Sequence, residues 1–283
     1  MIADDKFSRL AHRAAEVTVD LLPEIASNDA SPIHAHALKA RALREMFSFD
    51  AVRLRIADGL LNEAERINAT PDLLAWRSLL RMFMIVERTE TDLATLREEA
   101  EENSQLALEG AGSNTLVLGL VGKVQVLLDD DVIGGGALSR DAIRLNPGNP
   151  VGLSGLATAL MRDGRAAEAV ALARKGRAIA QNSPYVHWWG LFCCLAEITT
   201  GEFAAALRSA EAVHARAPNF RAPMRHLYAL YLKFGDLERA KLVAERLRSL
   251  EPDFSLRKIR ASPDYPAGVL RSSPLIELSD YVL

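Results

Sequence analysis

The chain has 283 residues, a formal net charge of −3 at pH 7 and 49% hydrophobic residues. This length is enough for a large core or for a solenoid of several repeats, and the apolar content excludes a generally disordered chain. The slightly negative charge argues against a dedicated nucleic-acid surface, so we expect no direct nucleic-acid binding.

Three features bear on the cellular setting. No stretch approaches the roughly 18 uninterrupted apolar residues that a membrane span needs. Residues 1–16 are charged and lack an apolar signal core, so we expect no export and a cytoplasmic location. Cys193 and Cys194 are neighbours in sequence and cannot easily form an unstrained bridge, so we interpret them as buried thiols.

The first part of the chain predicts a cap and two helix pairs. Residues 1–32 are expected to form an N-terminal capping helix, because apolar residues recur there at helical spacing from Phe7 to Leu21. Two pairs follow at about 33–70 and 71–112, where apolar stripes alternate with turn signals.

Residues 113–149 predict a third pair with an unusual feature. Gly134, Gly135 and Gly136 stand where its second helix should begin. Each glycine disfavours a helix by roughly 1 kcal/mol relative to alanine. The triplet therefore either allows a close helix crossing or loosens this part of the chain. A phosphate-binding loop would need a preceding strand and a following Lys-Ser/Thr, and neither is present.

An internal repeat dominates the second half of the chain. Prolines recur every 34 residues, and so do turn glycines and pairs of alanines; these are Pro150, Pro184, Pro218 and Pro252, Gly201 and Gly235, Ala206 and Ala240, and Ala210 and Ala244. A period of this length is typical of a repeated helix-turn-helix unit. We predict three pairs at 150–183, 184–217 and 218–252, followed by a C-terminal cap or tail at 253–283.

This pattern resembles that of tetratricopeptide repeat (TPR) proteins. The matching residues are Gly201, Phe203, Ala206, Ala210 and Pro218 in one repeat and Gly235, Leu237, Ala240, Ala244 and Pro252 in the next. The resemblance implies an all-α fold: a right-handed α-solenoid of about six TPR-like helix pairs with N- and C-terminal capping segments. Small residues would let the paired helices touch, and proline would reset the chain direction between units.

A narrower resemblance concerns bacterial regulators. The run from Asp131 to Pro147, together with 164–169 and 251–256, is similar to the repeat region that follows winged-helix DNA-binding or adenylate cyclase domains. It implies the C-terminal part of a regulator whose output domain is absent from this chain, because neither a winged helix nor a cyclase motif occurs in the sequence.

Motifs for chemistry are missing from the sequence. It contains no Cys-x-x-Cys, no His-x-x-x-His with a carboxylate, no Gly-x-Ser-x-Gly and no Gly-x-Gly-x-x-Gly after a strand. We therefore predict no catalytic residue, no metal site and no cofactor, and interpret the chain as non-enzymatic.

The repeat register predicts where binding occurs. A helix-pair solenoid presents the first helix of each pair on its concave side. Trp188 and Trp189 are the most informative candidates, because we expect one indole to pack between repeats and the other to point into the groove. A one-residue error in register exchanges the two, and burial of both in the core is the alternative. Aromatic and arginine side chains commonly anchor interfaces. The predicted groove residues are Ser154, Thr158, Trp188, Trp189, Leu191 and Arg225.

Two functions remain open from the sequence. The first is a protein–protein interaction scaffold that binds a partner protein or peptide in the concave groove, in bacterial regulation, with a homodimer possible. The second is the sensory or oligomerisation domain of a transcriptional regulator, with a small ligand or its own tail in the groove. An open groove favours the first, and closure by 263–283 or a compact apolar cavity favours the second.

Overall fold

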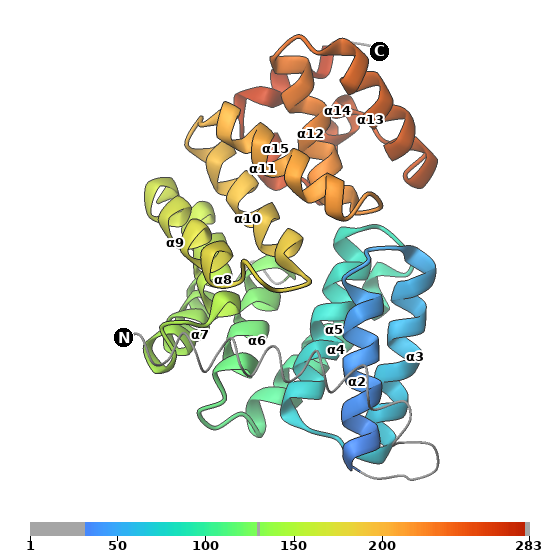
Figure 1. The fold of residues 1–283 in the computed structure, drawn as a ribbon, viewed down its shortest axis with the longest axis vertical. Helices are drawn as coiled ribbons and strands as arrows, with labels where there is room; N and C mark the ends of the chain where they lie inside the picture. Colours follow the sequence, from blue (N-terminus) through green and yellow to red (C-terminus); the bar gives the residue numbers. More distant parts are fainter. Residues whose placement is uncertain (1–31, 129–130, 281–283) are drawn as a thin grey trace.

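The computed structural model describes residues 32–128 and 131–280, and in these ranges the chain is all-α without a strand (Figure 1). The prediction of an all-α solenoid of helix pairs is confirmed. The N-terminal cap predicted for 1–32 lies outside the described residues except for its last position.

Twelve helices form six consecutive antiparallel pairs, each packed on the next. The pairs are α2 (Pro32–Met46) with α3 (Ala51–Ile67), α4 (Pro71–Val86) with α5 (Leu93–Glu109), α6 (Thr115–Leu128) with α7 (Val132–Leu145), α8 (Pro150–Arg162) with α9 (Ala166–Ile179), α10 (Val186–Thr199) with α11 (Phe203–Arg216), and α12 (Arg221–Lys233) with α13 (Leu237–Leu250).

The segment after α13 packs back on the last repeats. It contains α14 (Leu256–Ala261), α15 (Gly268–Arg271) and the 3-10 helix η1 (Pro274–Asp280). Tyr265, Leu270 and Leu275 are buried in one apolar cluster with Leu227 and Tyr228 of α12. These contacts cover the apolar surface that a last repeat would otherwise expose.

Small residues bring the paired helices together, as the repeat pattern predicts. The alanines at the recurring positions of α9, α11 and α13 are buried, with exposures of 0 to 2%: Ala169, Ala173, Ala206, Ala210, Ala240 and Ala244. A larger side chain at these positions would push the two helices apart or force an unfavourable rotamer.

The five turns between paired helices that the structure describes in full each use a left-handed backbone residue. Gly164, Gly201 and Gly235 take this position in the last three pairs, with φ of 77°, 77° and 73°. Phe49 and Arg88 take it in the first two pairs, with φ of 55° and 50°. Glycine adopts this conformation freely, whereas a residue with a side chain is strained there by about 1–3 kcal/mol.

The glycine triplet forms a close helix crossing. Helix α7 runs through all three glycines. A methyl group added at Gly135 would meet the carbonyl oxygen of Gly122 and would lie 2.8 Å from Cγ2 of Val126. The backbones of α6 and α7 therefore touch at this point, which settles the alternative that the sequence left open.

The chain curves until its first pairs meet its last repeats (Figure 1). The α2–α3 turn contacts the starts of α10 and α12, and the α4–α5 turn contacts the start of α12 and the residues after α13. One apolar core cluster accordingly extends from Ala35 to Ala222. Solenoid repeats ordinarily contact only their neighbours, so this closure is a departure from the regular architecture.

Gly135→Ala tests the α6–α7 crossing, with Gly59→Ala as its matched control in a helix interior. A methyl group at Gly59 would meet nothing within 4 Å, so Gly59→Ala should stabilise the chain by up to about 1 kcal/mol. Gly135→Ala should destabilise it by about 1–3 kcal/mol, because the backbones must separate. Urea unfolding measures both, and equal stabilisation by the two changes would contradict the close crossing.

Candidate functional site

The six predicted groove residues are all buried. Ser154, Thr158, Trp188, Trp189, Leu191 and Arg225 are between 0 and 6% exposed. The sequence left open whether the groove is open or covered, and at two of these residues it is covered: Phe47 packs on Trp188, and Val86 and Pro266 bind Arg225. Both indoles are buried, as in the alternative kept from the sequence. The part of these residues in partner binding stays a prediction.

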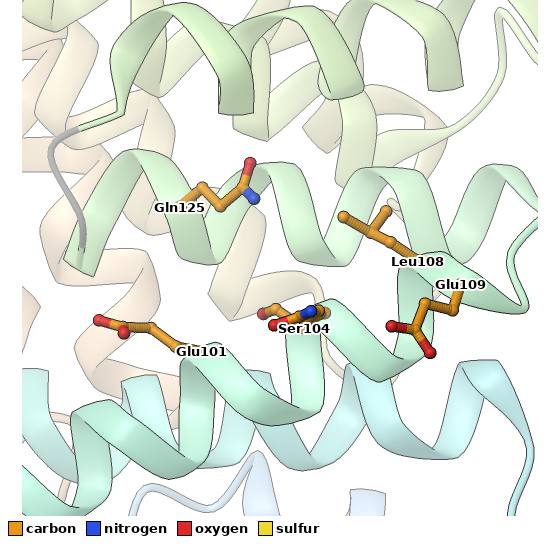
Figure 2. Close-up of a pocket in the computed structure, with 6 residues that line it drawn as sticks. Glu101, Ser104, Leu108, Glu109 and Gln125 are labelled. Atoms are coloured by element: carbon orange, nitrogen blue, oxygen red, sulfur yellow. The ribbon is translucent and has the colours of Figure 1, made fainter.

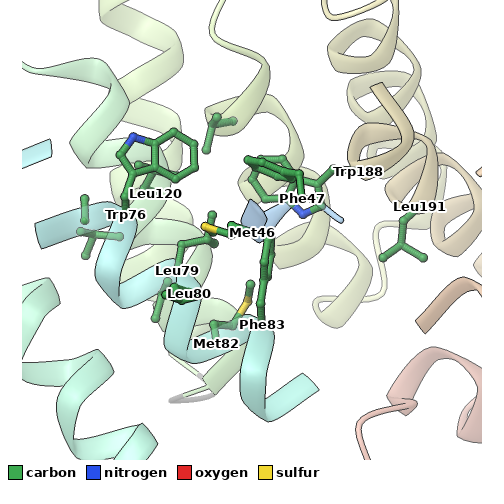
Figure 3. Packing of buried hydrophobic residues seen from close by; sticks show 14 of the residues in the cluster. Met46, Phe47, Trp76, Leu79, Leu80, Met82, Phe83, Leu120, Trp188 and Leu191 are labelled. Carbon is green, nitrogen blue, oxygen red and sulfur yellow. The ribbon is translucent and has the colours of Figure 1, made fainter. Parts of the chain in front are cut away.

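Aromatic rings from the α2–α3 turn cover α10 and α12. Phe47 stacks on Tyr185 with ring centroids 4.3 Å apart, and its centroid lies 5.3 Å from that of Trp188 (Figure 3). Phe49 lies parallel on Phe220 at 3.5 Å. We call these five rings the aromatic contact. Ring pairs of this kind contribute roughly 0.5–1.5 kcal/mol each beyond their burial, so the contact holds the two parts of the chain together.

The α2–α3 turn also forms hydrogen bonds to the last two repeats, through a backbone carbonyl and a carboxylate. Nε2 of His187 donates to the carbonyl oxygen of Phe47 at 2.9 Å. Nδ2 of Asn219 donates to Oδ2 of Asp50 at 3.2 Å. The other carboxylate oxygen of Asp50 caps the first turn of α3. Asp50 therefore caps its own helix and also accepts a hydrogen bond from the last repeat.

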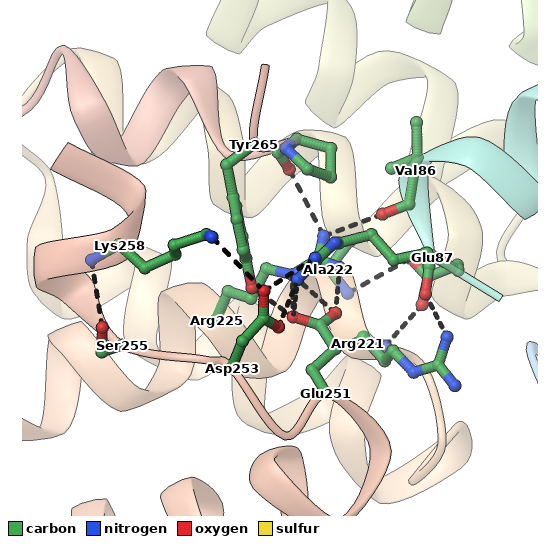
Figure 4. Close-up of polar contacts among 12 residues, drawn as sticks. Val86, Glu87, Arg221, Ala222, Arg225, Glu251, Asp253, Ser255, Lys258 and Tyr265 are labelled. Atoms are coloured by element: carbon green, nitrogen blue, oxygen red, sulfur yellow. Dashed lines mark hydrogen bonds and ion pairs between the residues drawn. The ribbon is translucent and has the colours of Figure 1, made fainter. Parts of the chain in front are cut away.

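A buried polar cluster joins the α4–α5 turn to α12 (Figure 4). The carboxylate of Glu87 accepts the backbone N–H of Arg221 at 2.6 Å and that of Ala222 at 3.2 Å. The guanidinium of Arg221 donates in turn to the carbonyl of Glu87. Glu87 therefore caps the N-terminus of a helix 134 positions away, where the favourable helix dipole adds to the hydrogen bonds. Burial raises the pKa of Glu87 to about 7, although Arg225 and Arg221 act in the opposite direction.

Arg225 connects this cluster to the C-terminal segment. Its guanidinium pairs with the buried carboxylate of Glu251 and donates to the carbonyl oxygens of Val86 at 2.9 Å and Pro266 at 3.3 Å. The hydroxyl of Tyr265 donates to Glu251 as well, and the centroid of its ring lies 5.3 Å from the Arg225 guanidinium. Arg225, Glu251, Tyr265 and Pro266 belong to the last repeat and the segment after it, so the bond to the Val86 carbonyl oxygen is the one of these contacts that depends on closure.

Arg88 adds a partly exposed ion pair at the edge of the cluster. It donates two hydrogen bonds to Asp253, at 2.7 and 2.9 Å, and its guanidinium lies 4.7 Å from the ring centroid of Tyr265. The hydrogen bond to Asp253 raises the pKa of Arg88 above its usual range, and Arg88 holds the pKa of Asp253 below its own. The later pairs have glycine at this turn position, whereas the Arg88 side chain reaches the segment after α13.

Lys123 is a buried amine on the same inner face. It is 0% exposed, donates to Oγ of Ser154 at 3.1 Å, and places Nζ 3.2 Å from the ring centroid of Phe192 and 5.3 Å from that of Trp188. Burial lowers the pKa of Lys123 well below its usual value. Ser154 and Trp188, both predicted from the sequence, are thus joined through a lysine that was not.

Arg225 is in the polar cluster, whereas Ser154 and Trp188 share Lys123, so the predicted residues do not form one site. Sequence reasoning also missed Glu87, Glu251 and the two phenylalanines of the α2–α3 turn. Two features of the sequence could have pointed to the missed residues. Lys123 is the one charged residue among 115–128, and the turns of the first two pairs have residues with side chains where the later pairs have glycine.

An open hollow of about 750 Å³ lies between α5 and α6 (Figure 2). Its lining residues are Glu101, Ser104, Gln105, Leu108, Glu109 and Gln125. The Ser104 hydroxyl is hydrogen-bonded to that of Ser78 at 2.7 Å. None of the predicted groove residues lines this hollow, and its two carboxylates face no cationic side chain of the lining.

The two cysteines are free thiols in the interior of the protein. Cys193 and Cys194 are both buried, and burial raises the pKa of Cys193 to about 12. Across 32–128 and 131–280, no three His, Cys, Asp or Glu side chains gather in a way that could hold a metal ion. Within the same ranges, no helix combines the length and apolarity needed to cross a membrane.

Solved structures with a similar fold include TPR proteins. The chain resembles pilF of Pseudomonas aeruginosa (17% identity, TM-score 0.45, covering 81% of this chain and 94% of that one) and a tetratricopeptide repeat protein of Parabacteroides merdae (16%, 0.43, 86% and 94%). It also resembles yeast Tom70 (12%, 0.45, 96% and 62%). No protein-family model and no curated protein sequence matches the chain. Because these TM-scores are below 0.5, our description of the fold rests on its own helices and contacts.

Glu87→Ala should be far more destabilising than Asp253→Ala. Removing Glu87 leaves Arg221 and Arg225 with less buried counter-charge and α12 without its cap, which should cost about 3–5 kcal/mol. Asp253 pairs with Arg88 at the surface, so its loss should cost about 1 kcal/mol or less. Urea unfolding compares the two variants, and similar losses would show that the buried cluster does not form.

Lys123→Met should raise the free energy of unfolding by about 0.5–2 kcal/mol, because it replaces a buried amine by an apolar side chain of similar length. The unfolded chain binds the Lys123 proton at pH values below 10.5 at which the folded chain has released it. Stability in the wild type should therefore rise with pH toward 10.5, and Lys123→Met should remove this contribution. Lys241→Met, at an exposed position of α13, is the control and should change neither property. A large loss of stability in Lys123→Met would contradict the description.

Proposed function

We propose that the chain is a non-enzymatic protein–protein interaction scaffold that binds a partner protein or peptide on its inner face, and that this face is held closed by the chain itself. One observation carries the proposal. Two of the inner-face candidates are covered by distant parts of the chain: Phe47 packs on Trp188, and the carbonyl oxygens of Val86 and Pro266 accept hydrogen bonds from Arg225.

The chemistry of the covered face suits a binding surface. Trp188, Trp189 and Arg225 are the kinds of side chain that anchor protein interfaces. The segments that cover them make polar and charged contacts as well as apolar ones, as in interfaces that can separate. Phe49 and Arg88 hold a left-handed backbone that costs strain, and the side chains of both contact distant parts of the chain.

A second candidate function is favoured by the C-terminal segment. Tyr265 and the carbonyl oxygen of Pro266 lie against Arg225, so residues after the last repeat reach an inner-face candidate. This arrangement supports a sensory domain of a bacterial regulator in which the tail occupies the groove and a signal releases it. The regulatory setting itself is proposed from the sequence resemblance alone.

An opened variant tests the proposal. Arg88→Gly with Asp253→Ala removes the edge ion pair and the Arg88–Tyr265 contact, while glycine suits the turn backbone. Hydrogen exchange at the amides of Arg221 and Ala222 should accelerate several-fold, because the closed population falls. Recovery of a partner from native lysate should rise, and adding Trp188→Ala should abolish the increase.

The matched control is Arg165→Ala with Asp163→Ala, which removes an exposed ion pair in the turn between α8 and α9. It should leave hydrogen exchange and partner recovery as in the wild type. If the opened variant exchanges faster at α12 and still recovers no more partner than this control, the proposed function is wrong.

A further inference from the structure

The α2–α3 turn occupies the inner face in the manner of a bound peptide. It reads Phe47-Ser48-Phe49-Asp50, and both rings, a backbone carbonyl and the acidic side chain each contact a residue between 185 and 220. The contacts join residues at least 138 positions apart (185 − 47). The turns of the last three pairs have glycine at the position of the second phenylalanine.

The receiving surface has a separate place for each part of the turn. Tyr185 and Trp188 receive the first ring, and Phe220 receives the second in parallel stacking at 3.5 Å. His187 donates to the carbonyl between them, and Asn219 donates to the carboxylate. These five residues, which we call the peptide receptor, all lie at or just before the starts of α10 and α12.

We infer that the peptide receptor recognises a segment of a partner protein with the pattern aromatic, any residue, aromatic, acidic, and that Phe47–Asp50 is an internal copy of this ligand. The inference rests on the proposed function and names the chemistry of the partner. Stacking fixes the spacing of the two aromatic residues, the His187–carbonyl bond fixes the backbone between them, and Asn219 selects an acceptor at the fourth position.

A direct binding measurement tests the inference. The full chain carrying Phe47→Ala and Phe49→Gly has an unoccupied receptor, and glycine keeps the turn conformation. A fluorescent peptide of residues 44–53 should bind this variant, as measured by polarisation. A peptide with alanine at both phenylalanine positions should bind at least about tenfold more weakly, because it lacks both ring contacts. Phe220→Ala in the receptor should weaken binding of the peptide that keeps both phenylalanines and should leave binding of the alanine peptide unchanged.

A second measurement covers the case in which the double variant does not fold, since Phe47 also packs on Phe83. The wild type and the opened variant, Arg88→Gly with Asp253→Ala, are mixed with a peptide whose first phenylalanine carries a photo-crosslinker. Crosslinks should fall within 185–192 or 219–222 and should increase in the opened variant, because the internal copy competes at a high effective concentration. Absent or scattered crosslinks in both proteins would overturn the inference.

A dimer in which the turn of one copy crosslinks to the receptor of another would also overturn it, because the occupant would then be a second copy of the chain. The two proposals fail separately. If the peptide does not bind while Trp188-dependent partner recovery persists, the scaffold stands and the ligand pattern is wrong. If the peptide binds but the opened variant recovers no partner, the pattern stands and the proposed function is wrong.

Discussion

Phe49 lies flat on Phe220, and the carboxylate of Glu87 accepts the first two amide hydrogens of α12. They hold the turns of the first two helix pairs against the last repeats. A solenoid is ordinarily a sum of contacts between neighbouring units. Here the ends are joined as well, so the first pairs and the last repeats are expected to open together rather than one unit at a time.

The closure combines strain with charges that are costly to separate. Phe49 and Arg88 hold a left-handed backbone that glycine would adopt freely. Arg225 and Glu251 are buried together, and a buried pair of this kind contributes little net stability yet is expensive to break on one side. These properties suit a contact with two discrete states, in which a competing partner must replace several interactions together. Lys123 is a further buried side chain on this face, where it donates to Ser154 and places Nζ 5.3 Å from the ring centroid of Trp188.

The helices were predictable because their signals are local. Recurrent prolines, buried alanines and turn glycines determine where a helix begins, which face packs and how the chain reverses, and all of these act within about 34 residues. The register also selected Trp188 and Arg225 as inner-face residues. It could not show that Phe47 would pack on Trp188, or that the carbonyl oxygens of Val86 and Pro266 would accept hydrogen bonds from Arg225. A repeat pattern indicates the helix face on which a residue lies but not which distant segment packs against that face.

By itself the sequence determined an all-α chain of stacked helix pairs, with small residues between paired helices and glycine at the turns of the later repeats. The tertiary structure decided that the concave face is closed and that the glycines near Gly135 form a helix crossing. The physical reason is the distance along the chain over which each kind of contact acts. Helix formation and pairing depend on neighbours a few turns away, whereas closure depends on small rotations accumulated over six pairs. Those rotations bring Glu87 to Arg221, and no local pattern contains their sum.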